Sequence, residues 1–180
     1  MRFPELDDAT MHASVGDAAI ILDAEICAYD PLSRTVLPFQ TLQGRAKKAP
    51  TAEQVAETSV CVFVFDLLYL EGHSLRGASL GERRALLRQH VRPQPGRLMF
   101  AEGEVTSTVS GLEAALAHAV EVGSEGLMCK VLEGDLSRRV ARAMAGGWLV
   151  DRALAVVARG RACMAERREP VAVAFAFAVL

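Results

Sequence analysis

The sequence has 180 residues, of which 51% are hydrophobic, so it is long and apolar enough to bury a core, and wholesale disorder is excluded. Its formal net charge of −2 gives no overall positive field of the kind that attracts nucleic acid. The charge is uneven, because residues 1–135 carry 12 Lys and Arg against 19 Asp and Glu, whereas residues 136–180 carry 8 Arg against 3 acids. This break predicts that the last part of the chain differs from the rest.

The four cysteines, Cys27, Cys61, Cys129 and Cys163, are far apart and form no Cys-x-x-Cys or Cys/His group. This spacing argues against a zinc site or a disulfide scaffold and predicts an intracellular, reducing compartment. The N-terminal residues lack the apolar stretch of a secretory signal, and no apolar run reaches the ~18 residues of a membrane span. We therefore expect no membrane partner.

Two strands dominate the first half of the chain. Alternation along residues 18–29 places Asp23 and Glu25 on one face and leaves the other face wholly apolar, which predicts one buried face. Residues 60–72 are rich in β-branched and aromatic side chains and predict a buried strand. Asp66 interrupts this apolar run, so it must find a hydrogen bond, and we interpret it as structural.

Two helices are predicted, over 80–91 and over 110–122, because a serine lies three residues before a glutamate at the start of each. The pairs are Ser79 with Glu82 and Ser110 with Glu113. Short strands are expected over 97–102 and 125–131. Together these elements predict an α+β domain with an incomplete mixed or antiparallel sheet and flanking helices.

The signals weaken toward the C-terminus. Helices are conceivable near 138–145 and 151–158, and the apolar residues 172–180 are a strand or a collapsed tail. We expect one domain over 1–149 and a divergent tail, rich in Ala and Arg, over 150–180 that packs poorly against it and contains no OB-fold domain.

Three segments occur in a recognisable order and spacing: ILDAEICAYD at 21–30, VFVFDLLYLEG at 62–72 and EGLMCK at 125–130. With LPFQTL at 37–42 and LRGASLGERRALLRQHV at 75–91, they resemble motifs III, IIIa and IV of the central adenylation domain of ATP-dependent DNA ligases, eukaryotic replicative type. The resemblance implies a partial nucleotidyltransferase (ATP-grasp-like) adenylation domain of the α+β class.

The resemblance also implies a site. It assigns Glu25 to the ribose and a metal, Phe65 to adenine, Glu125 to the catalytic metal and Lys130 to phosphate. Magnesium is expected, because carboxylates are the hard oxygen ligands that it prefers. The residues alone leave blander interpretations open: Glu25 on a solvated strand face, Phe65 as a core aromatic that spacing does not distinguish from Phe63, and Lys130 as a surface lysine.

The family reaction begins when a lysine in a KxDGxR motif attacks the α-phosphate of ATP, giving lysyl-AMP. The three lysines here are Lys47, Lys48 and Lys130, and none is followed by x-Asp-Gly. The motif V lysines of the family correspond to Val150 and Arg152. We therefore expect no nucleophilic lysine in this chain and no catalysis by the isolated chain.

The function implied by the resemblance is that of a DNA ligase fragment. The family seals nicks through enzyme-AMP and DNA-AMP intermediates in DNA replication, repair and recombination. Expected partners are ATP, Mg²⁺ and nicked double-stranded DNA, in the nucleus. Two origins stay open: a gene fragment or imperfect gene model, and a catalytically dead paralogue. A non-catalytic domain that binds nucleotide or partner proteins is the alternative function.

Overall fold

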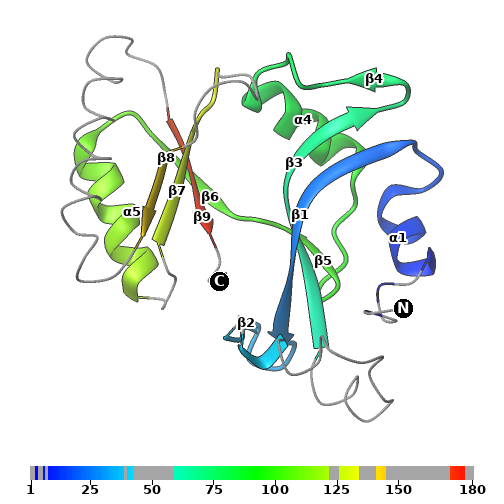
Figure 1. Cartoon of the computed structure of the whole chain (residues 1–180), viewed down its shortest axis with the longest axis horizontal. Coiled ribbons are helices and arrows are strands. Elements are labelled where there is room, and N and C mark those ends of the chain that lie inside the picture. Colours follow the sequence, from blue (N-terminus) through cyan, green and yellow to red (C-terminus); the bar gives the residue numbers. More distant parts are fainter. Residues whose placement is uncertain are drawn as a thin grey trace. The chain divides into compact units, whose positions relative to one another are not determined.

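The computed structural model describes residues 3, 6, 8–38, 40–42, 59–121, 126–133, 141–144 and 171–176 (Figure 1). The chain divides into two compact units, one formed by residues 1–75, 83–100 and 180 and the other by residues 76–82 and 101–179. Its helices and strands are, in chain order, α1 Asp8–Val15, β1 Ile20–Asp30, β2 Thr35–Val36, β3 Ser59–Leu70, β4 His73–Ser74, α4 Leu80–His90, β5 Leu98–Phe100, β6 Gly103–Thr106, α5 Val109–Glu121, β7 Gly126–Val131, β8 Ala141–Met144 and β9 Val171–Ala176.

The first unit is built on a five-stranded sheet in the order β2-β1-β3-β4, with β5 also paired with β3. The long β1–β3 ladder is antiparallel and runs from the pair Ile20–Leu70 to the pair Tyr29–Ser59. Strand β5 is parallel to β3, so the sheet is mixed. The expected strands over 18–29, 60–72 and 97–102 are confirmed, each with slightly different ends.

A tight turn joins β3 to β4. Glu71 and Gly72 both have positive φ, 48° and 86°, between the paired residues Leu70 and His73. Two successive positive φ values are typical of a type I′ hairpin turn, in which glycine avoids steric cost. The Glu71 carboxylate also accepts a hydrogen bond from the Ala19 N–H at 2.8 Å, which ties the turn to the start of β1.

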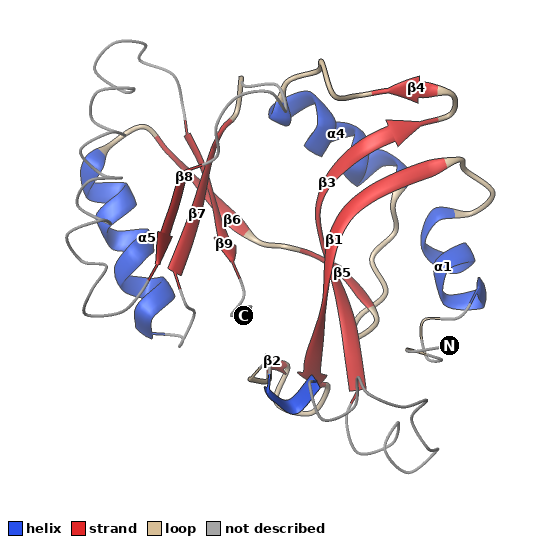
Figure 2. Ribbon diagram, viewed as in Figure 1, coloured by secondary structure: helices blue, strands red, loops and turns tan. Residues whose placement is uncertain are grey.

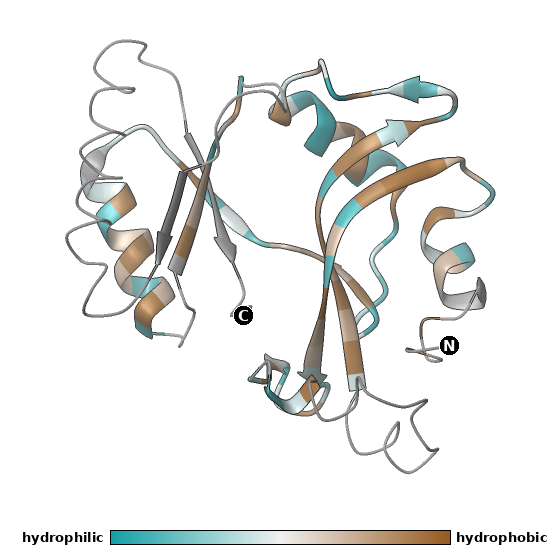
Figure 3. Cartoon of the chain, viewed as in Figure 1, coloured by the Kyte–Doolittle hydropathy of each residue, from teal (hydrophilic) through white to brown (hydrophobic). Residues whose placement is uncertain are grey.

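The core of this unit lies on one face of the β1–β3 pair. Val62, Val64, Leu67 and Leu70 of β3 are buried there together with Leu87, Val91 and Leu98, and β1 adds Ile20, Leu22 and Ile26. Helix α1 contributes Met11 and Val15 to the same core. The face of β1 that was predicted to be apolar is therefore the one that faces the core. Figure 3 shows β1 and β3 as largely hydrophobic, while α4 has both polar and apolar parts.

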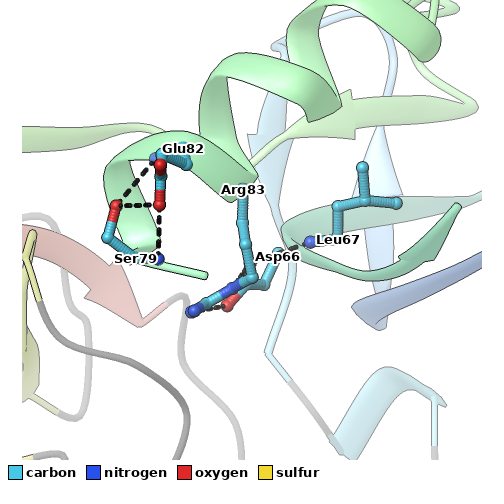
Figure 4. Close-up of polar contacts among 5 residues, drawn as sticks. All are labelled: Asp66, Leu67, Ser79, Glu82 and Arg83. Carbon is cyan, nitrogen blue, oxygen red and sulfur yellow. Dashed lines mark hydrogen bonds and ion pairs between the residues drawn. The ribbon is translucent and has the colours of Figure 1, made fainter. Parts of the chain in front are cut away.

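Helix α4 begins with the predicted capping box. The Ser79 N–H and hydroxyl each donate to the Glu82 carboxylate at 2.8 Å, and the Glu82 N–H donates to the Ser79 hydroxyl at 3.3 Å (Figure 4). These reciprocal bonds satisfy backbone donors that the first helical turn leaves unpaired. The helix ends at His90, ahead of Pro93.

The second unit contains a four-stranded sheet in the order β6-β9-β7-β8, whose three pairings are all antiparallel. Helix α5 contacts β6, β7 and β9 and lies along this sheet (Figure 2). Its buried residues Leu112, Ala115 and Ala119 form an apolar stripe at helical spacing, and Leu127 of β7 is buried as well. None of the helices in the described ranges is long and apolar enough to cross a membrane.

Several expectations for this part of the chain are wrong. The strand near 125–131 belongs to this second sheet and not to the sheet of β1 and β3. Residues 141–144 form a strand, not part of a helix, because pairing with β7 outweighs the helix-favouring composition ARAM. Within the tail, Val171–Ala176 forms β9 between β6 and β7, so these six residues are not loosely attached. The possible helix over 151–158 lies outside the described residues.

The cap of α5 also differs from the prediction. The helix begins at Val109, and the Thr108 hydroxyl accepts the Gly111 N–H at 3.1 Å, so Thr108 is the N-cap in place of Ser110. The Ser110 hydroxyl instead donates to the Thr108 hydroxyl at 3.4 Å. A run of hydroxyl residues offers several serine and threonine caps, and the spacing to Glu113 selected the wrong one.

Candidate nucleotide-binding site

Glu25 lies where one face of β1 changes from exposed to buried. On this face Ile21 is 54% exposed and Asp23 is exposed, Glu25 is half-buried, and Cys27 and Tyr29 are buried. A carboxylate in this position remains accessible to a ligand while its strand is fixed by a core below it. The face that was predicted to carry two carboxylates is therefore solvated at one end only.

Phe63, the cross-strand partner of Glu25, is a core ring. It is 3% exposed and packs edge-on against Tyr29, with ring centroids 6.1 Å apart and an interplanar angle of 63°. This is a favourable geometry for two aromatic rings. Spacing alone left Phe63 and Phe65 as alternatives for a ligand-facing ring, and burial removes Phe63 from that choice.

Phe65 is the extra residue of a β-bulge. In the β1–β3 ladder Asp23 pairs with Asp66 and Ala24 with Val64, so Phe65 has no partner on β1. Its side chain is half-buried, whereas residues 60–64, 66 and 67 are buried. Bulges turn a strand locally and re-aim the side chain they carry. No local sequence signal predicts this bulge, because it depends on the register with β1.

Phe65 lies outside the main core cluster of this unit. Its neighbour Val64 belongs to that cluster, and the described residues of the cluster do not include Phe65. The bulge interrupts the alternation of side chains at this point, so the register with β1, not simple alternation, sets the direction of Phe65.

Asp66 has the partners that its place in an apolar strand requires. Its two carboxylate oxygens accept hydrogen bonds from Arg83 Nε at 2.8 Å and Arg83 Nη2 at 2.7 Å, and one of them also accepts the Leu67 N–H at 2.8 Å (Figure 4). Asp66 is 0% and Arg83 2% exposed. The structural interpretation of Asp66 is confirmed. No sequence signal singles out Arg83 as this partner.

The thiols beside Glu25 are held in their neutral form. Burial, followed by the negative charge of Glu25 and by Cys61, raises the pKa of Cys27 to about 12. Burial likewise raises the pKa of Cys61, its cross-strand partner, to about 12. The three cysteines in the described ranges, which include Cys129, are free of disulfide bonds.

The remaining predicted site residues belong to the second unit or lie outside the described part. Lys130 is half-buried on β7 and pairs in register with Ala172 of β9. By alternation it lies on the face opposite the buried residue Leu127. Glu125, Val150 and Arg152 lie outside the described residues. Within the described ranges no three His, Cys, Asp or Glu side chains gather as a metal site.

Comparison with known proteins identifies the family. The protein-family model described as "ATP dependent DNA ligase domain" matches residues 2–142. The chain belongs to this family. Over 142 residues it is 33% identical to DNA ligase 1 of Drosophila melanogaster, and this match covers 78% of the chain and 19% of the relative. Over 133 residues it is 40% identical to DNA ligase 1 of Dictyostelium discoideum, covering 73% of the chain and 11% of the relative.

A solved structure agrees with these relatives. The ligase domain of LigD from M. tuberculosis superposes with a TM-score of 0.53 at 25% identity, covering 78% of this chain and 42% of that chain. The mixed helix and sheet architecture is therefore that of ligase nucleotidyltransferase domains, as the motifs predicted. The chain spans about a tenth to a fifth of the length of the two DNA ligase 1 relatives and corresponds to part of an ATP-dependent DNA ligase.

Proposed function

We propose that this chain forms part of the ATP site of a DNA ligase, with Phe65 contacting adenine and Glu25 contacting the ribose. The observation that carries the proposal is the arrangement of these two residues on the paired strands β1 and β3. Glu25 and Phe65 are both half-buried next to the buried Phe63, and the bulge leaves Phe65 unpaired in the ladder. A half-buried aromatic ring and a half-buried carboxylate on paired strands offer a flat surface for a base and an acceptor for ribose hydroxyls.

The proposed metal is Mg²⁺, held by Glu25 and Glu125. The half-buried carboxylate of Glu25 fits this ion, because hard oxygen donors are its preferred protein ligands. When bound, the ion would neutralise phosphate charge. Lys130 is proposed to contact phosphate as a point charge.

Nicked double-stranded DNA is the proposed substrate of the whole enzyme, with ATP as co-substrate, and the nucleus is its proposed location. Both proposals rest on membership of the ligase family. The roles in DNA replication, repair and recombination are general to DNA ligases. The chain has no lysine followed by x-Asp-Gly, so we propose that it supplies base, ribose and metal contacts but not the covalent nucleophile.

Comparing ATP with inorganic tripolyphosphate tests the adenine contact. In Mg²⁺ buffer, Phe65→Ala should weaken ATP binding by roughly 5- to 150-fold, the range that corresponds to about 1–3 kcal/mol for a base–aromatic contact. Tripolyphosphate has no base, so its affinity should not change. Leu32→Ala is the matched control, because Leu32 is 94% exposed in a turn. Equal weakening of both ligands, or no change in ATP affinity, would contradict the proposal.

A further inference from the structure

Phe65 is not the only irregular residue of β3. A second register shift follows three residues later, where Ile21 pairs with Tyr69 and Leu22 with Leu67, so that Leu68 also lacks a partner on β1. Asp66 and Leu67 are therefore a two-residue stretch between two bulges. A ladder broken on both sides supplies few hydrogen bonds of its own to fix the direction of this stretch.

The Asp66 carboxylate supplies the missing constraint. It accepts the N–H of Leu67, the next residue of the strand, and a bidentate pair of bonds from Arg83 of α4. The guanidinium and carboxylate are both planar, so two parallel bonds fix their mutual orientation as well as their distance. Both side chains are buried, so water does not compete for these bonds.

We infer that the buried Asp66–Arg83 pair is a positioning device that fixes the bulge and hence the direction of the Phe65 ring. The inference rests on the proposed function, in which Phe65 contacts adenine. Arg83 touches no nucleotide in this account; it acts through Asp66, which is bonded directly to Phe65 in the chain. The geometry of an adenine contact would then depend on a helix residue 18 positions away from Phe65 in the sequence.

Fluorine NMR tests the positioning step without requiring ATP. The full chain is labelled with 4-fluorophenylalanine, and the Phe65 signal among the seven phenylalanines is assigned by its loss in Phe65→Leu. The informative variant is Asp66→Asn with Arg83→Gln, which removes both charges of the pair together. The Phe65 signal should move or broaden in this variant. An unchanged Phe65 signal in the folded double variant would overturn the inference.

Two further variants sharpen the test. Arg83→Lys keeps the charge but cannot form the bidentate pair, so its Phe65 signal should be displaced as well. Arg88→Lys is the matched control, because Arg88 is exposed on the same helix, and its spectrum should match the unmodified chain. Should the double variant fail to fold, the spectrum of Arg83→Lys decides the inference alone.

The consequence for nucleotide binding is measured separately. In the Asp66→Asn/Arg83→Gln variant, ATP should bind about five- to tenfold more weakly, toward the low end of the range for losing a base–aromatic contact, while tripolyphosphate affinity stays unchanged. The triple variant, in which Phe65→Ala is added, should bind ATP with the same affinity as the Phe65→Ala single variant. If Phe65→Ala leaves ATP affinity intact, the proposed adenine contact is wrong, whereas the fluorine signal still decides whether the ion pair fixes Phe65.

Discussion

Arg83 Nη2 lies 2.7 Å from Asp66 Oδ2 in a site where both side chains are almost wholly removed from solvent. Replacing Asp66 with Ala would leave the Arg83 guanidinium buried without its carboxylate, which is expected to cost about 3–5 kcal/mol of folding free energy. Urea unfolding followed by circular dichroism measures this loss. The control is Asp23→Ala, since Asp23 is the exposed cross-strand partner of Asp66 and its loss should cost less than about 0.5 kcal/mol. Equal losses would contradict the account of the pair.

The α4 cap predicts a pH dependence of stability. The Ser79 N–H, and secondarily its hydroxyl, hold the pKa of Glu82 below its ordinary value of 4.5. A carboxylate whose pKa is lower in the folded state contributes stability above its unfolded pKa, and this contribution disappears as the pH falls through the folded pKa. The melting temperature of the unmodified chain should therefore fall more steeply below about pH 4.5 than that of the Glu82→Gln variant. Identical pH profiles would exclude the capping carboxylate as a source of the effect.

The same cap is testable at neutral pH. Ser79→Ala should lower the free energy of unfolding by about 0.5–2 kcal/mol, because it removes the acceptor of the Glu82 N–H. Ser110→Ala should have a much smaller effect, since Thr108 caps α5. Denaturant titration of the two variants compares them directly. A larger loss of unfolding free energy for Ser110→Ala than for Ser79→Ala would support Ser110 as the N-cap of α5, as the sequence predicted.

Comparison of the predicted with the observed elements shows which features local sequence signals determine. An acidic residue in an apolar strand requires a hydrogen-bond partner, and Asp66 has one in the structure. The spacing of Ser79 and Glu82 correctly predicted the start of α4. The identity of the partner, Arg83, depends on how α4 lies on β3, which no local pattern encodes. The bulge at Phe65 and the insertion of β9 between β6 and β7 depend on long-range register for the same reason. The assignment of Glu25, Phe65 and Glu125 to contacts with one nucleotide and its metal stays a prediction.

Gly111 occupies a position that a side chain would not fit. A Cβ built on it would meet the hydroxyl of Thr106 and approach the Thr106 Cβ to 2.8 Å. Alanine normally stabilises a helix by about 1 kcal/mol relative to glycine, but here overpacking of about 1–3 kcal/mol should outweigh that gain. Gly77→Ala is the control, because nothing lies within 4 Å of its added Cβ. A gain in melting temperature for Gly111→Ala would contradict the packing around α5.

The buried thiols should be inert in the folded chain. Burial raises the pKa of Cys27 and of Cys61 to about 12, so almost no thiolate exists at pH 8. In a Cys129→Ser/Cys163→Ser variant, Ellman's reagent should react only after denaturant is added. Fast reaction under native conditions, at a rate independent of denaturant, would show that this face of the β1–β3 pair is open.

We propose that this chain carries ligase nucleotide contacts without the covalent nucleophile. The direct test incubates the purified 180-residue chain with Mg²⁺ and α-labelled ATP and then separates it on a denaturing gel. Losing a stabilising charge costs roughly 10²–10³-fold in rate, whereas losing the nucleophile removes the route altogether, so no labelled band is expected. A complete ligase of the family, run alongside, should be labelled. A band on this chain that survives denaturation would contradict the account, and its disappearance in Lys130→Arg would identify the nucleophile.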